Sequence, residues 1–104
     1  MVIYNVTISI DQHIAVDWLE WMRSKHIPDV LKTGCFLECK LSKLNGHEEG
    51  GLSYSVMYLA PNQDALDLYQ NQYAAALQQE HLLRFDGKFA AFRTTLSVIE
   101  TFNR

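Results

Sequence analysis

The chain has 104 residues, of which 48% are hydrophobic and 20% are charged, and its formal net charge at pH 7 is −3. This composition is typical of a folded protein, and the length suits one domain, which we expect to cover residues 1–104. The small negative charge and the scattered basic residues disfavour nucleic acid and anionic membranes as partners. No apolar run reaches the ~18 residues of a transmembrane helix, and no signal peptide is evident, so we expect a cytoplasmic protein.

The first elements are a strand and a helix. Alternating apolar and polar residues predict a strand over residues 2–10. Asp11 then predicts the N-cap of a helix, whose apolar stripe includes Trp18 and His26. Pro28 is expected to end the regular helix near His26, because a proline disfavours helical geometry in the residue before it. A short second helical turn is expected from Pro28, with Gly34 stopping it.

The remaining elements are expected in the order strand, strand, helix, strand, over residues 35–44, 52–60, 61–84 and 89–101. A polar, glycine-bearing stretch between the two middle strands predicts a hairpin loop. On the second strand, the alternation places Leu37 toward the core. On the second helix, Tyr73 is expected on the buried stripe, and His81 contributes to a cationic last turn.

This order of elements defines the expected fold. A β-α-β-β-α-β chain with a hairpin between its middle strands is the ferredoxin-like split βαβ arrangement. Right-handed crossovers then give a four-stranded antiparallel sheet with two helices on one face. The fold class is therefore α+β, ferredoxin-like βαββαβ.

The sheet face without helices must meet solvent, a ligand or a partner. The alternation assigns to it Ile3, Asn5, Thr7, Ser9, Glu38, Lys40, Ser42, Ser53, Ser55, Met57, Phe89, Arg93, Thr95, Ser97 and Ile99. Its centre is polar and its apolar residues gather toward the strand ends, which favours packing against a second copy over simple solvation. We therefore expect a homodimer, in which Glu38 pairs across the interface either with Arg93 or with Lys40.

Segments along nearly the whole chain carry a family resemblance: residues 3–7, 18–22, 26–31, 33–36, 79–81, 84–85 and 88–94. They resemble an uncharacterised bacterial family of short proteins that is known only as a domain of unknown function. The layout is also similar to the dimeric α/β-barrel superfamily, which implies a homodimer. That superfamily includes cofactor-independent monooxygenases, haem-degrading enzymes, small isomerases and ligand-sensing domains, so the resemblance assigns no activity. The Asn-Trp-His set of the haem-degrading members is not placed here: Asn5 lies in a suitable first strand, but the tryptophans and histidines lie on different elements from theirs.

Five residues are candidates for ligand binding: His26, Trp18, Tyr54, Asn5 and Arg93. The most informative is His26, which faces the sheet and could act as a general base or a ligand donor. The favoured alternative is a core histidine whose N–H bonds a backbone carbonyl near Pro28. Trp18 and Tyr54 could line a pocket for an aromatic ligand, although such residues more often form core. No catalytic residue is assigned.

We expect no metal, haem or other cofactor. Cys35 and Cys39 would lie roughly 13 Å apart along a strand, too far to share a disulfide or one ion. His47 and Glu48 share a loop, but a metal site needs three or four convergent ligands.

Three functions remain open, and each predicts a different geometry. The favoured one is a small-molecule binding or sensing homodimer, which requires a cavity without a positioned acid or base. The second is a cofactor-independent monooxygenase or isomerase-like enzyme using His26 or Arg93, which requires an accessible pocket converging on His26. The third is a structural or interaction module, which requires neither.

Overall fold

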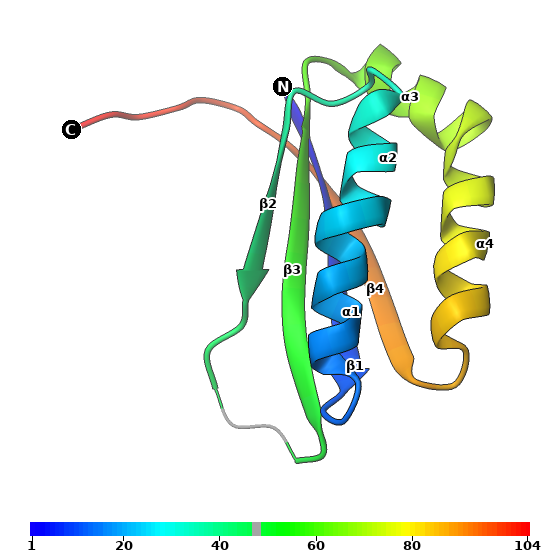
Figure 1. Ribbon diagram of the computed structural model, residues 1–104. Coiled ribbons are helices and arrows are strands. Elements are labelled where there is room, and N and C mark those ends of the chain that lie inside the picture. The colour runs from blue at the N-terminus through cyan, green and yellow to red at the C-terminus, as the bar shows by residue number, and fades with distance from the viewer. Residues whose placement is uncertain (47–48) are drawn as a thin grey trace.

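The computed structural model describes residues 1–46 and 49–104, and its elements follow the expected order (Figure 1). The strands are β1 (Val2–Asp11), β2 (Glu38–Lys43), β3 (Gly51–Ala60) and β4 (Phe89–Ser97). The helical segments are α1 (Ala15–Trp21), η1 (Met22–His26), α2 (Ile27–Lys32), α3 (Gln63–Gln72) and α4 (Ala74–Phe85). His47 and Glu48, which were considered as metal ligands, lie outside the described residues.

The four strands form one antiparallel sheet in the order β2-β3-β1-β4, and the helices cover one of its faces (Figure 1). β1 is central and pairs along its whole length with β3, from Val2 opposite Ala60 to Asp11 opposite Gly51. This arrangement confirms the predicted α+β, βαββαβ fold. No helix among the described residues is long and apolar enough to cross a membrane.

The core lies between the sheet and the helices. Along β1 buried side chains alternate with partly exposed ones, as period-two patterning predicts for a strand with one covered face. Trp18 of α1, Met22 of η1, and Leu66 and Tyr69 of α3 complete the core, and each is at most 3% exposed. Removing these apolar surfaces from water is the main stabilising contribution.

The first helical segment of the chain, α1–η1–α2, differs from its prediction at both ends. Asp11 ends β1, and its carboxylate accepts the His13 backbone N–H at 2.8 Å, whereas Ile14 occupies the N-cap position without a side-chain cap. The short second helix expected from Pro28 is present, but the chain remains helical up to it. The chain passes through the π-helical turn η1, where the Ile27 N–H donates to the Met22 carbonyl, and α2 then begins with Pro28 in its first turn. Pro28 has no N–H to donate to the preceding turn, and the wider π-helical turn η1 accommodates it without ending the helix.

The second helical segment of the chain consists of two helices, α3 and α4, where one continuous helix was expected. Tyr73 leaves helical geometry, with φ −124° and ψ −32°, and separates α3 from α4. Its side chain is 38% exposed, so the prediction that it is buried is wrong. The buried stripe restarts one residue later and includes Ala74, His81 and Phe85.

Strand β2 begins later than expected. Leu37 precedes it and is 59% exposed, while its neighbours Cys35 and Phe36 are both buried. The Leu37 N–H donates to the Leu59 carbonyl at 2.7 Å, but residues 35–37 are not in regular strand geometry, so strict alternation does not apply to them. The inward placement of Leu37 is therefore wrong.

Strand β4 presents the opposite face from the predicted one. Arg93 lies opposite Val6 and so faces the helical layer, whereas Thr94 lies opposite Asn5 on the uncovered face. Both faces of β4 carry apolar side chains, so alternation alone could not distinguish them, and a one-residue change of register exchanges them. The predicted pairing of Glu38 with Arg93 across the uncovered face is therefore wrong.

The start of α3 offers a local stability test. Asn62 is its N-cap, and its side-chain oxygen accepts the Ala65 N–H at 2.9 Å. We expect Asn62→Ala to lower the free energy of unfolding by about 1 kcal/mol, because that N–H loses its acceptor. Urea denaturation measures the loss. The control is Asn71→Ala, an exposed change within α3, which should not destabilise the protein. Equal stability of wild type and Asn62→Ala would contradict the capping role.

Candidate functional site

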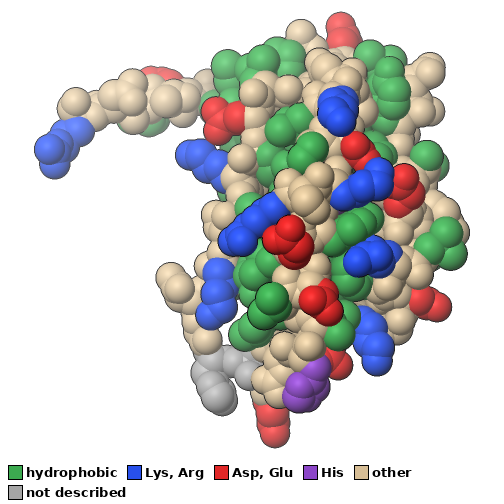
Figure 2. Space-filling view, in the orientation of Figure 1, with side chains coloured by type: hydrophobic (Ala, Val, Ile, Leu, Met, Phe, Trp, Pro, Cys, Tyr) green, Lys and Arg blue, Asp and Glu red, His purple; other side chains and the backbone are tan. Residues whose placement is uncertain are grey.

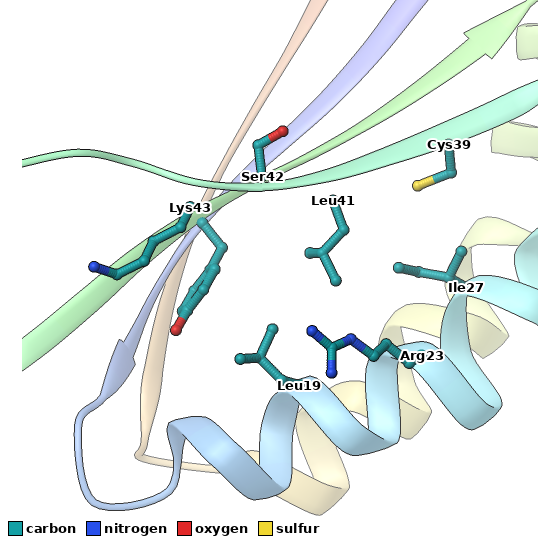
Figure 3. Close-up of a pocket in the computed structure, with 8 residues that line it drawn as sticks. Leu19, Arg23, Ile27, Cys39, Leu41, Ser42 and Lys43 are labelled. Atoms are coloured by element: carbon teal, nitrogen blue, oxygen red, sulfur yellow. The ribbon is translucent and has the colours of Figure 1, made fainter.

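A groove opens between the helical segment α1–η1–α2 and the edge strand β2, and we call it the α1–β2 groove (Figure 3). It has a volume of about 580 Å³ and is lined by Leu19, Arg23, Ile27, Cys39, Leu41, Ser42, Lys43 and Tyr54. Its helical wall comes from three residues spaced four apart, which places them along one side of the helix. Its other wall comes mainly from β2, which lies at the edge of the sheet.

The α1–β2 groove is cationic and apolar. Arg23 and Lys43 form no ion pair with the described residues, and no carboxylate or imidazole lines the groove. In Figure 3 the Arg23 guanidinium lies in the space between Leu19 and Leu41. Burial raises the pKa of the Cys39 thiol to about 11, so it is protonated and a weak nucleophile at neutral pH. The groove can therefore attract an anion, but it offers no evident general acid or base.

A second group of side chains lies where α1 and η1 pack beside α4. We call these residues, Trp18, Trp21, His26 and His81, the histidine–tryptophan cluster. Trp18 is fully buried, and its Nε1–H donates to Nε2 of His81 at 2.9 Å. The Trp21 and His26 rings are stacked, with centroids 5.2 Å apart, and the two histidine rings are 5.8 Å apart. The cluster thus ties α1 and η1 to α4.

Both histidines of the cluster are neutral at pH 7. Burial is the main reason that the pKa of His26 and that of His81 fall to about 4. His81 accepts a hydrogen bond at Nε2, so its proton resides on Nδ1. His26 Nδ1 is buried and has no hydrogen-bond partner among the described residues. The predicted bond from His26 to a backbone carbonyl near Pro28 is therefore not formed within that part of the chain.

The five predicted site residues do not converge on one site. Trp18 and His26 belong to the histidine–tryptophan cluster, and Tyr54 lines the α1–β2 groove with its ring 5.0 Å from that of Trp18. Asn5 lies on the opposite face of the sheet, because it alternates with the buried residues of β1. Arg93 lines a separate hollow of about 410 Å³ between β4 and α4.

Three residues that matter here were not among the predicted site residues. Arg23 and Lys43 were not singled out in the sequence, and His81 was expected only to contribute to a cationic last turn. The spacing of Arg23 between Leu19 and Ile27 was an available signal, since it places a cation inside an apolar stripe. For His81 the available signal was its spacing of four residues from Phe85 and from Leu77, both hydrophobic.

The uncovered sheet face, which we call the open face, has a hydrogen-bonded centre. Ser55 donates to Asn5 Oδ1 at 2.6 Å, and Asn5 Nδ2 donates to the hydroxyls of Thr7 at 3.1 Å and Thr94 at 3.5 Å. Toward one end of the strands there is a hollow of about 160 Å³, the open-face hollow, lined by Ile3, Glu38, Lys40, Met57, Tyr58 and Leu59. The predicted combination of a polar centre and an apolar end is therefore confirmed for β1, β2 and β3.

Charged side chains do not segregate by sign on the side seen in Figure 2, where basic and acidic groups are interspersed. Within residues 1–46 and 49–104, no three His, Cys, Asp or Glu side chains converge as a metal site would require.

The strand order and the one-sided helices define a ferredoxin-like protein. A dimeric ferredoxin-like protein from an uncultured marine organism is 13% identical, with 100% of each chain covered and a TM-score of 0.68. A variant of MhuD with two manganese protoporphyrin IX molecules bound per active site is 19% identical, with 100% of each chain covered and a TM-score of 0.73. SnoaB, a cofactor-independent oxygenase from Streptomyces nogalater, is 16% identical over 99% of this chain and 98% of its own, with a TM-score of 0.66. At these identities the likeness shows a shared fold.

The chain belongs to the family described as Domain of unknown function (DUF4286), whose model matches residues 1–99. The resemblance to an uncharacterised family seen in the sequence is thereby confirmed. No curated protein matches the chain in sequence.

Proposed function

We propose that this protein is a small-molecule binding or sensing homodimer that holds an anionic, largely apolar ligand in the α1–β2 groove. The observation that carries the proposal is the groove itself: about 580 Å³ of space with two cations and no lining carboxylate. This volume is in the range of small-molecule sites, which are mostly apolar with a few polar groups that orient the ligand. The cytoplasmic location expected from the sequence stays a prediction.

The lining residues indicate the chemistry of the ligand. A guanidinium presents a planar fork of donors that matches a carboxylate or phosphate, and an ammonium adds a second positive charge. Arg23 and Lys43 would supply these groups, and they have no ion-pair partner among the described residues to compete with a ligand. Leu19, Ile27 and Leu41 would cover an apolar body. A medium-chain or aromatic carboxylate has this combination.

The homodimer is supported by the open face and by the similar proteins. One neighbour that matches over the whole chain is described as dimeric. The open face leaves Phe92 67% and Leu96 48% exposed, and burying such side chains against a second copy would stabilise an assembly.

The enzyme alternative receives less support from the geometry. One similar protein, SnoaB, is a cofactor-independent oxygenase. An enzyme using His26 requires an accessible pocket at that ring, but the α1–β2 groove is lined by neither His26 nor His81. Burial also keeps the pKa of both rings near 4, which makes them weak bases at neutral pH.

The binding proposal is tested first by native mass spectrometry of the protein as purified, which reports any retained small molecule. The second test is isothermal titration with octanoate and with octanamide, which differ in charge at the head group. We expect octanoate to bind more tightly than octanamide. Arg23→Gln and Lys43→Gln should each weaken octanoate binding by about tenfold, the loss of one charge-assisted contact.

Lys32→Gln is the matched control for these two variants. Lys32 is an exposed cation at the end of α2 and does not line the groove, so its removal should leave octanoate binding unchanged. Equal affinity for octanoate and octanamide, or equal losses in all three variants, would show that the groove does not select an anion.

A further inference from the structure

The chain ends in an extended arm, residues 98–104, that the rest of the described structure does not cover. Strand β4 ends at Ser97, opposite Val2, and one more bond joins the Val98 N–H to the Met1 carbonyl at 2.9 Å. Beyond this bond the arm has no strand partner among the described residues, and it leaves the sheet. It projects away from the body of the domain in Figures 1 and 2.

Two large apolar side chains lie on this arm. Ile99 is 98% exposed and Phe102 is 82% exposed. Single exposed apolar residues are common on protein surfaces, but these two are three residues apart on an arm with almost no other contacts. Covering both would remove a substantial apolar area from water, and residues 1–46 and 49–97 do not cover them.

The open-face hollow lies at the end of the sheet where the arm begins. Ile3, beside Val2, is one of its walls, and it pairs with Leu59, which in turn pairs with Glu38. The hollow therefore presents an apolar floor with charged side chains from β2 at its rim.

Symmetry relates the arm of one copy to the hollow of another. If two open faces pack together about a two-fold axis along the strands, β4 of one copy lies over β2 of its partner, and corresponding strand ends coincide. The arm then starts beside the partner's open-face hollow. An extended chain advances about 3.3 Å per residue, so residues 98–104 can span roughly 20 Å, more than the width of four strands spaced about 4.8 Å apart.

We propose that the arm of each copy lies across the open face of a second copy, with Ile99 and Phe102 covering its open-face hollow. Charge is complementary as well: Glu100 and Arg104 of the arm can pair with Lys40 and Glu38 at the hollow's rim. This inference rests on the homodimer proposed above. It adds a defined contribution from each subunit to the other.

The first test is sedimentation at micromolar concentrations of wild type and of the double variant Ile99→Asp, Phe102→Asp. Both residues are exposed in the single chain, so the substitutions should not affect its folding. We expect a dimer for wild type and a dimer dissociation constant about tenfold or more higher for the variant. The control is Val16→Asp on α1, where the side chain is 80% exposed on the helical side and dimerisation should be unchanged.

The second test places the contact between subunits. A mixture of Phe102→Cys and Met57→Cys proteins should form a covalent heterodimer on mild oxidation, whereas Val16→Cys mixed with Met57→Cys should not. A monomeric wild type would overturn both the homodimer and the arm contact. A wild-type dimer that the arm variant leaves intact, without cross-linking of Phe102→Cys to Met57→Cys, would overturn the arm contact alone.

Discussion

Replacing Trp18 by alanine is expected to lower the free energy of unfolding by about 3–5 kcal/mol, the cost of truncating a fully buried large aromatic side chain. Trp18 is 0% exposed, packs against Tyr54, and donates its Nε1–H to His81. The alanine variant loses this packing and leaves a cavity between α1 and the sheet. Urea denaturation followed by circular dichroism measures the change.

Two further variants separate packing from hydrogen bonding at Trp18. Trp18→Phe retains an aromatic ring but leaves His81 Nε2 without its donor, so we expect a smaller loss of stability than with alanine. Val16→Ala, an exposed change on the same helix, should alter stability by less than about 0.5 kcal/mol. A loss below about 1 kcal/mol for Trp18→Ala would contradict the central place of this residue in the core.

Acid is expected to destabilise the protein through the two histidines of the histidine–tryptophan cluster. Burial lowers the pKa of His26 and of His81 to about 4 in the folded chain, against 6.5 for an unperturbed histidine. Below pH 6.5 the unfolded chain therefore binds protons that the folded chain does not. The stability that the neutral rings contribute is fully present above pH 6.5 and is lost as the pH falls toward 4, by roughly 2–3 kcal/mol for each ring at pH 4.5.

The charged groups around the histidines explain why burial dominates. Asp29 raises the pKa of His26, while Lys25 and Arg93 lower it, so the surrounding charges largely oppose one another. For His81, both His26 and Arg93 act in the same direction as burial. Protonating one ring therefore makes protonation of the other more difficult.

Urea midpoints at pH 7.0, 6.0, 5.0 and 4.5 test the acid effect. The stability of wild type should fall steadily across this range, and His81→Gln, although less stable at pH 7, should depend less steeply on pH. His13→Gln removes an exposed ring before α1 and should follow the wild-type curve. A stability that is flat between pH 7.0 and 4.5 would show that the two rings are not buried in solution.

Much of the fold was accessible from sequence because its central features rest on strong local patterns. β1 alternates without interruption, since it is covered by helices on one face only, and this pattern fixes which face Tyr4 and Val6 present. β4 has no comparable contrast, because Phe89 and Phe92 lie on opposite faces and both are apolar. The faces of β4 are set by its pairing with β1, and this long-range contact leaves no local signature.

The candidate site was less predictable because it depends on how separate elements meet. Arg23 and Lys43 are 20 positions apart in the sequence, and only the packing of the helical segment α1–η1–α2 beside β2 brings them to one groove. His81 was missed for a different reason. It was interpreted from its charge at a helix end, although its spacing of four residues from Leu77 and Phe85 places it on the buried side of α4.

The central position of β1 has a consequence for how the protein is made. β1 is synthesised before both of its partners: it pairs on one side with β3 and on the other with β4, whose last paired residue, Ser97, lies opposite Val2. Contacts so distant in sequence form late and slow folding, because a long loop must close before they contribute. Until synthesis reaches β4, one edge of β1 has no native partner, and its apolar residues are open to association with other nascent chains.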